Sequence, residues 1–168
     1  MLRRLSLVVV VLAACTAALV PAANAAKPIR NPFVAPPPTT FPAGLVCPFE
    51  VFVEAVENRQ TETIFSDGTI KVTGFFSTRV VNTENDEELT LVSGGSVRLS
   101  PEGDNLLVEI RGPIIVFFFP GDAGPGDVSV GRTYYLHGHT SAVVDPATFL
   151  FVSFEHRGEA TDLCAALA

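Results

Sequence analysis

The sequence predicts an all-β domain, and the pattern of its apolar runs carries that prediction. From Phe49 onward, short runs rich in Val, Ile, Phe and Thr alternate with Gly, Pro, Asp and Asn. This spacing is typical of an antiparallel sandwich or barrel. Helical periodicity is confined to a short C-terminal segment. We therefore expect a single antiparallel sandwich or barrel of about 8–10 strands with a short C-terminal helical turn.

The first 25 residues predict a secretory signal peptide. Arg3 and Arg4 form a charged start, an apolar run covers 5–20, and small residues at 23–25 form a cleavage site. A lipoprotein signal is the alternative, because Leu-Ala-Ala-Cys at 12–15 resembles a lipobox and would leave Cys15 acylated. The sequence thus predicts an exported protein, either free outside the cell or lipid-anchored at Cys15.

The charge balance argues against two classes of partner. The chain has 11 basic and 18 acidic residues and a net charge of −7, which becomes −9 when Arg3 and Arg4 leave with the signal peptide. Nucleic acids and anionic membrane surfaces are bound by basic surfaces. We therefore expect no nucleic-acid partner. The sequence does not identify the partner, and the cell envelope and an extracellular ligand are the candidates.

Two cysteines remain once Cys15 is removed or acylated. Cys47 stands at the start of the predicted β domain, and Cys164 stands 117 positions later in its C-terminal tail. An even number of thiols in an exported protein predicts a disulfide. A Cys47–Cys164 bridge would join the two ends of the domain.

The predicted organisation has three parts. A signal peptide at 1–25 is followed by a Pro-rich linker at 26–46 and a disulfide-closed β domain at 47–168. Dense proline predicts that the linker is extended and does not join a sheet. Strands are expected near 49–57, 61–66, 69–75, 77–82, 88–93, 96–100, 106–111, 114–119, 133–144 and 149–157. The run at 114–119 is apolar on both faces and predicts a strand covered on both sides.

The closing hairpin holds three candidate metal ligands. If Asp145 faces Thr148 across the turn, His137 lies opposite His156, and His139 points to the same face. Three imidazoles on one face suit zinc or copper. The alternative is that they are ordinary strand residues, because no Asp, Glu or Cys accompanies them at metal-ligand spacing.

Motifs of enzymes and cofactor sites are missing from the sequence. It has no nucleophile elbow, no His-Glu-x-x-His and no Gly-rich phosphate loop. A glycosidase pair could be assembled from distant strands, such as Glu54 and Glu109, but any acidic β protein allows such a pair. We therefore expect no catalytic residues, no cofactor and no enzymatic activity.

Four segments resemble a group of small exported proteins of actinobacteria. They are Cys-Pro-Phe-Glu-Val at 47–51, Ile-Phe-Ser-Asp-Gly at 64–68, the stretch from Gly112 to Asp122, and Asp-Leu-Cys-Ala-Ala-Leu at 162–167. Members of this group open on a cysteine and close on a similar Leu-Cys tail. The resemblance implies an exported β domain with a terminal bridge, and it names no substrate. The His137-Gly138-His139 triplet is not part of the group's pattern.

These observations leave three hypotheses for function. The first is a non-catalytic binding or cell-envelope-associated module that presents the loops at 83–88 and 120–132. The second is a small barrel that carries a hydrophobic ligand in a cavity lined by some of its 13 Phe residues. The third is a metal-binding protein that uses the histidine cluster. An interior void of several hundred cubic ångströms would favour the carrier, because ligand pockets have that size.

Overall fold

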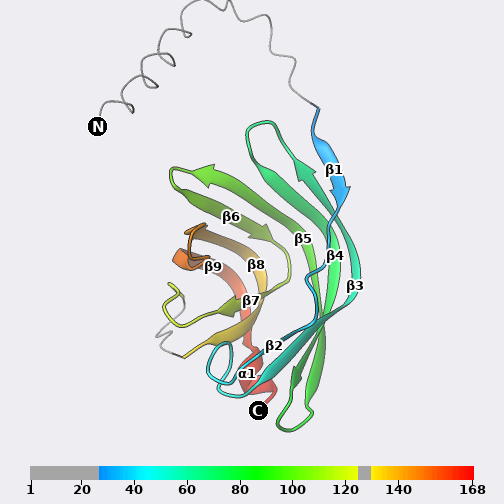
Figure 1. Ribbon diagram of the computed structural model, residues 1–168, viewed down its shortest axis with the longest axis vertical. Coiled ribbons are helices and arrows are strands. Elements are labelled where there is room, and N and C mark those ends of the chain that lie inside the picture. The colour runs from blue at the N-terminus through cyan, green and yellow to red at the C-terminus, as the bar shows by residue number, and fades with distance from the viewer. Residues whose placement is uncertain (1–26, 125–129) are drawn as a thin grey trace, which may run out of the picture.

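The computed structural model describes residues 27–124 and 130–168, so the predicted signal peptide and Cys15 lie outside the described residues. The described chain is almost entirely β, which confirms the predicted fold class (Figure 1). Its elements are β1 (Ile29–Pro32), β2 (Thr39–Phe41), β3 (Val51–Ile64), β4 (Ile70–Asn82), β5 (Glu88–Glu102), β6 (Asn105–Arg111), β7 (Ile114–Phe118), β8 (Arg132–Val144), β9 (Phe151–Asp162) and α1 (Leu163–Ala166).

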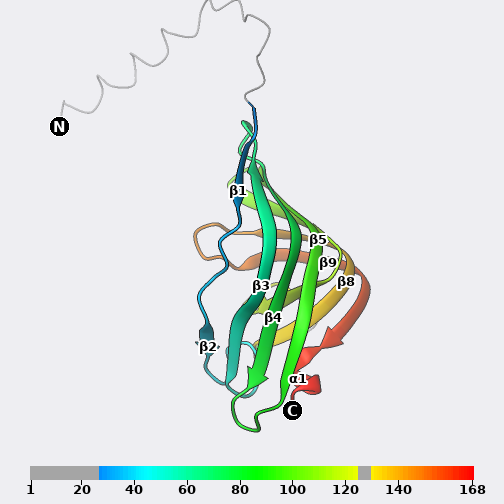
Figure 2. The same ribbon diagram turned by 90° about the vertical axis from the view of Figure 1, so that its right-hand side faces the viewer.

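All the strands belong to one antiparallel sheet that curls on itself (Figures 1 and 2). Strands β3, β4 and β5 are long neighbours, and β6 pairs with β5. Both β6 and β7 pair with β8, β6 along 139–144 and β7 along 132–136. Strand β9 forms one edge of the sheet beside β8, and β1 and β2 together form the other edge beside β3.

Side chains divide the sheet into an inner, apolar face and a polar face. Alternate residues of a strand point to opposite faces of a sheet. In β4, Val72 and Val80 are buried on one face, whereas Lys71, which points to the other face, is exposed. On β6, Ile110 is buried on the same face as Val72, because cross-strand partners share a face. We call the face with Val72, Val80 and Ile110 the inner face.

Five glycines lie side by side across the sheet, in β4, β5, the β6–β7 junction, β8 and β9. Gly74 pairs with Gly95, Gly112 donates its N–H to the Gly138 carbonyl at 2.9 Å, and Gly138 pairs with Gly158. All five have positive φ. Glycine at such positions lets a strand bend sharply without leaving the ladder. This glycine seam marks the level at which β6 gives way to β7 along β8.

The two ends of the domain meet at one end of the sheet. Cys47 and Cys164 form the predicted disulfide, with their Cα atoms 5.4 Å apart. The bridge lies in an apolar cluster with Val46, Val51 and Leu167, all of them buried. Asp162 caps α1 by accepting a hydrogen bond from the Ala165 N–H at 3.1 Å. No helix of the described chain is long and apolar enough to cross a membrane.

Strand β7 is covered on both faces, as its composition predicts. Val116 and Phe118 are buried against Leu136 of β8. Ile115 and Phe117, on the opposite face, pack against the cluster around the disulfide. The strand therefore separates two apolar clusters, and one of these clusters contains the bridge.

The Pro-rich segment departs from its prediction. It is extended, but the expectation that it does not join a sheet is wrong, because β1 pairs with 61–64 and β2 with 51–53 of β3. Proline is compatible with an edge strand, where only one side of the backbone needs partners. The Pro-rich segment thus supplies an edge of the sheet through β1 and β2.

The connection between β8 and β9 is a turn organised by Asp145. Its carboxylate accepts hydrogen bonds from the Ala147 N–H at 2.8 Å and the Thr148 hydroxyl at 3.0 Å. The bond from Ala147 is the main cause that lowers the pKa of Asp145. The turn holds Phe149 at a φ of 61° with 77% of its surface exposed.

Replacing Phe149 by asparagine should raise the free energy of unfolding by about 1 kcal/mol, because Asn tolerates the left-handed region much better than a bulky residue. Urea unfolding followed by circular dichroism measures the change. Phe149→Ala is the control, since it removes the exposed ring and keeps the backbone strain. An equal gain from both substitutions would show that the ring, and not the backbone, is responsible.

Candidate ligand pocket

A pocket of about 320 Å³ lies between the N-terminal edge and the inner face of the sheet. Strands β3, β4 and β5 contribute one side, and β7 contributes another. Its apolar lining consists of Phe33, Pro36, Pro37, Phe41, Val53, Ala55, Phe76, Ile114, Ile115 and Phe117. This volume lies at the lower end of the range of small-molecule sites.

The prolines of the N-terminal edge explain why this space is not filled by a regular strand. Between β1 and β2, residues 33–38 have no ladder partner in β3. Pro36, Pro37 and Pro38 have no N–H to donate, so the ladder cannot continue through them. We call residues 33–38 the strap. It lies over the middle of β3 and contributes Phe33, Pro36 and Pro37 to the pocket.

Two hydrogen bonds fix the first residue of the strap. The Phe33 N–H donates to the Gln60 carbonyl at 3.0 Å, and the Asn58 side-chain amide donates to the Phe33 carbonyl at 2.7 Å. Beyond this anchor the chain turns outward, and Val34 is 83% exposed. The strap is thus attached to β3 at both of its ends, by the hydrogen bonds of Phe33 and by the pairing of β2, and its prolines lie between these two attachments.

Aromatic rings close the pocket at the end nearest the disulfide. The ring centroids of Phe41 and Phe117 are 5.4 Å apart, and those of Phe41 and Phe119 are 6.2 Å apart. All three rings pack against the cluster that contains the Cys47–Cys164 bridge. This end of the pocket is therefore supported by the covalently closed part of the core.

A few polar groups interrupt the apolar lining: Thr39, Glu54, Gln60, Thr78 and Ser93. Glu54 is already paired, since its carboxylate lies 2.7 Å from the guanidinium of Arg79. The hydroxyls of Thr78 and Ser93 and the amide of Gln60 are neutral hydrogen-bonding groups. Apolar walls with a few fixed polar groups are typical of sites for small apolar molecules that carry one or two polar atoms.

The structure does not bring the three histidines onto one face. His137 pairs with Glu159 and His139 with Arg157, whereas His156 pairs with Thr140. Residues 137 and 139 share a face, and Thr140 and His156 lie on the other. The predicted register is therefore wrong. The part of the chain that the structure describes contains no group of three His, Cys, Asp or Glu able to hold a metal ion.

His156 has a local role in the hairpin. Its Nδ1 lies 2.9 Å from the Thr140 hydroxyl and its Nε2 lies 3.1 Å from the Glu159 carbonyl. His137 packs edge-on against Tyr135, with ring centroids 4.5 Å apart. The Tyr135 hydroxyl donates to the Val92 carbonyl at 2.7 Å, and burial raises the pKa of Tyr135. These contacts hold strands together.

The carboxylates Glu54 and Glu109 also remain apart. Glu54 pairs with Arg79, whereas the row of cross-strand partners that contains Glu109 reaches β3 at Thr63. Nine positions along a strand correspond to about 30 Å. The two side chains therefore do not form the pair of a glycosidase, whose carboxyl groups lie about 5–10 Å apart.

Most residues of the pocket could not be picked out from the sequence. The Phe content suggested an apolar cavity, but Phe76 and Phe117 look like ordinary core residues of their strands. The available signal was the proline run at 36–38 beside two segments able to pair, which marks a gap in an edge strand.

A comparison of the chain with protein-family models, with curated proteins and with solved structures finds no match.

Proposed function

We propose that the protein is an exported, non-catalytic binding domain that holds a small, largely apolar molecule in the pocket beneath the strap. The observation that carries the proposal is the pocket itself: about 320 Å³, with ten apolar residues among its lining. Molecules of this kind gain affinity mainly by leaving water for an apolar site.

Two features support export. The N-terminal sequence has the parts of a signal peptide. The Cys47–Cys164 disulfide is typical of proteins that fold in oxidising compartments. An apolar compound has low solubility outside the cell, and a domain stable in that environment could carry it or present it at the cell envelope.

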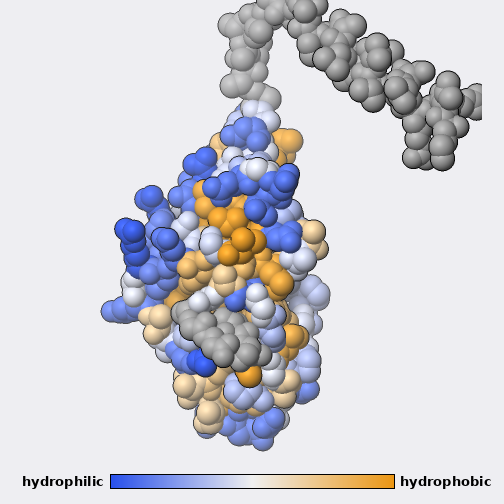
Figure 3. Space-filling model, turned by 90° about the vertical axis from the view of Figure 1, so that its left-hand side faces the viewer, coloured by the Kyte–Doolittle hydropathy of each residue, from blue (hydrophilic) through white to orange (hydrophobic). Residues whose placement is uncertain are grey.

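Apolar surface also reaches solvent on one side of the molecule. Figure 3 shows it in the middle of the face that forms the left-hand side of Figure 1, with polar side chains around it. Large contiguous apolar patches rimmed by polar residues often mark binding sites on soluble proteins. This surface supports an apolar ligand or an apolar partner.

Titration with N-phenyl-1-naphthylamine, an uncharged apolar fluorophore, tests the proposal. The wild-type protein should enhance its fluorescence with a saturable isotherm. Ser93→Phe should weaken binding by about tenfold or more, because Ser93 lies opposite Phe76 on the inner face and a ring there fills the pocket.

Thr90→Phe is the matched control for this substitution. Thr90 lies on the same strand, is exposed and pairs with Arg79 on the polar face. The Thr90→Phe substitution adds the same ring outside the pocket, so it should leave the fluorophore-binding isotherm unchanged. Thermal melts of both variants verify folding. Unchanged binding by a folded Ser93→Phe protein would rule out this pocket as the site.

A further inference from the structure

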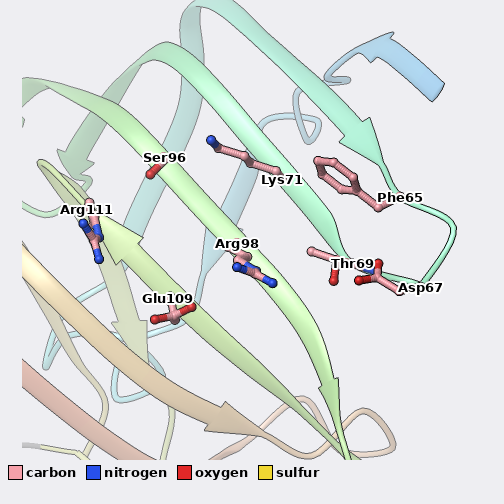
Figure 4. Close-up of a pocket in the computed structure, with 8 residues that line it drawn as sticks. All are labelled: Phe65, Asp67, Thr69, Lys71, Ser96, Arg98, Glu109 and Arg111. Carbon is pink, nitrogen blue, oxygen red and sulfur yellow. The ribbon is translucent and has the colours of Figure 1, made fainter. Parts of the chain in front are cut away.

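A second cleft, of about 450 Å³, lies on the polar face of β4, β5 and β6. Lys71 lies directly opposite Arg98 in the β4–β5 ladder, and Arg111 stands two positions from the partner of Arg98 on β6. Figure 4 shows the three side chains on neighbouring strands, on the same side of the sheet. The remaining lining residues are Phe65, Asp67, Thr69, Ser96 and Glu109. We call this the basic cleft.

The charge of the basic cleft is opposite in sign to the net charge of the chain. The protein has a net charge of −7, yet three of its 11 basic residues line this one cleft. Like charges directly opposite each other in a sheet are destabilising, and Lys71 and Arg98 occupy such a pair. Within the described residues, neither of them nor Arg111 has an ion pair within 4.0 Å.

Another arginine of the polar face shows the opposite arrangement. Arg79 lies between two carboxylates, 2.7 Å from Glu54 and 3.1 Å from Glu88. The hydrogen bond to Glu54 is the main cause that raises the pKa of Arg79. The sheet therefore neutralises one arginine across its strands and leaves the cations of the basic cleft free to meet an anion from outside.

The two acids of the cleft do not cancel its cations. Asp67 accepts a hydrogen bond from the Thr69 N–H at 2.9 Å in the β3–β4 turn. That bond is the main cause of the lowered pKa of Asp67. Glu109 is the cross-strand partner of Arg98, but no ion pair within 4.0 Å joins them in the described structure. Three cations and two carboxylates leave an excess of one positive charge.

We propose that the basic cleft binds a phosphate group. Arginine guanidinium forks match tetrahedral oxyanions with paired hydrogen bonds, and lysine adds a point charge. Arg98 has Lys71 as its cross-strand neighbour and Arg111 as a diagonal neighbour on the same face. Such neighbours lie about 5–8 Å apart, so a phosphate beside Arg98 is within reach of the long side chains on either side of it. The hydroxyls of Thr69 and Ser96 supply further donors. A bound phosphate would also reduce the repulsion between Lys71 and Arg98, because its negative charge lies beside both cations.

A phosphate group can come from a free solute or from a lipid headgroup, and two assays distinguish them. The full mature protein is titrated with inorganic phosphate by calorimetry, and separately with phosphatidylcholine vesicles with or without phosphatidylglycerol in a sedimentation assay. Saturable binding in the first assay indicates a free phosphate compound. Binding only to the anionic vesicles indicates a headgroup. No binding in either assay overturns the proposal.

Substitutions locate the site in whichever assay is positive. Arg98→Gln and Lys71→Gln should each weaken binding by about tenfold, as expected for the loss of one charged hydrogen-bonding partner. Arg59→Gln is the matched control, because Arg59 is exposed and paired with Glu57 at 2.7 Å outside the cleft. An equal loss in all three variants would overturn the cleft as a specific site.

Thermal melts separate this proposal from a fault in folding. Arg98→Gln removes the repulsion with Lys71 together with the attraction to Asp67 and Glu109. These effects oppose each other, so the variant should melt close to the wild-type temperature while it loses phosphate binding. If Arg98→Gln fails to fold, Arg111→Gln replaces it in the same assays. Binding of the uncharged fluorophore should be unchanged in these variants, and retention of phosphate affinity by folded variants would refute the proposal.

Discussion

Replacing Cys47 and Cys164 together by alanine is expected to lower the free energy of unfolding by about 4–5 kcal/mol. The bridge closes a loop of 117 residues, and a cross-link over such a loop removes much of the conformational entropy of the unfolded chain. Urea unfolding followed by far-UV circular dichroism measures the loss. The absence of tryptophan makes fluorescence a poor choice for this protein.

The folded state adds to the effect, because the bridge holds the C-terminal tail in the core. Helix α1 has four residues and is too short to form alone. Leu163 and Leu167 are each only 1% exposed, and the Leu167 carbonyl accepts hydrogen bonds from the Asn82 and Asn85 amides at 2.8 and 3.1 Å. Loss of the bridge should therefore loosen the tail before the sheet unfolds.

A reductant provides the control for the alanine variant. Dithiothreitol should destabilise the wild-type protein to the level of the double variant and leave the double variant unchanged. Equal urea midpoints for the wild-type and the double variant, without reductant, would contradict the assigned role of the bridge. Alanine is preferred to serine because both cysteines are buried, and a buried hydroxyl without a partner would add its own cost.

The sequence was a good guide to the class of fold and to its covalent frame. The strands expected at 61–66 and 69–75 leave Asp67 and Gly68 between them, and in the structure these residues form the β3–β4 turn, where the Asp67 carboxylate accepts a hydrogen bond from the Thr69 N–H. The Cys47–Cys164 pair and the short C-terminal helical turn were also predicted, and the structure has both. These features depend on neighbours in the chain or on the choice between two cysteines, so sequence reasoning reaches them.

Strand lengths could not be predicted in the same way. The breaks expected near Gly74 and near Gly94 and Gly95 are bends inside continuous strands, since β4 runs from Ile70 to Asn82 and β5 from Glu88 to Glu102. Glycine has low strand propensity, which makes each position look like an interruption. Only the register shows that the glycines of different strands meet in one seam and bend the sheet there.

The candidate metal site failed for a related reason. Its geometry depended on a turn in which Asp145 faces Thr148, but the Asp145 N–H donates to the Leu150 carbonyl at 3.0 Å, so the turn is longer. A register irregularity at Val143 and Val144 also precedes it. Because side chains alternate between faces, such shifts decide whether His156 joins His137 or opposes it. Local sequence does not determine them.

The pockets were beyond sequence reasoning because they depend on cross-strand register and on the path of the chain edge. Arg98 and Lys71 are 27 positions apart in the sequence and meet only in the β4–β5 ladder. The pocket beneath the strap requires the N-terminal edge to pair with β3 on both sides of its prolines. Composition gave the types of residue available, and the sheet decided which of them meet.

Replacing Gly138 by alanine is expected to lower the free energy of unfolding by about 3 kcal/mol or more. Gly138 has a φ of +134°, a conformation that residues with a side chain rarely adopt. Its partner Gly158 has a φ of +144°. A Cβ on Gly138 would collide with the Arg157 carbonyl oxygen, and one on Gly158 with the His137 carbonyl oxygen. Both collisions are with backbone, which cannot rotate away, so β8 and β9 would have to separate.

Gly103→Ala is the reference for a glycine with positive φ but no collision. Gly103 has a φ of +61°, but a Cβ there meets no atom within 4 Å, so its replacement should cost only about 1–2 kcal/mol. The difference between the two variants in urea unfolding measures the combined cost of the close approach and of the φ of +134° at the seam. If Gly138→Ala lowers the free energy of unfolding by no more than Gly103→Ala does, β8 and β9 can separate at little cost. The glycine seam would then not be needed for the bend of these strands. A larger loss at Gly138 means that the bend of β8 and β9 depends on two strands that approach each other more closely than a side chain allows.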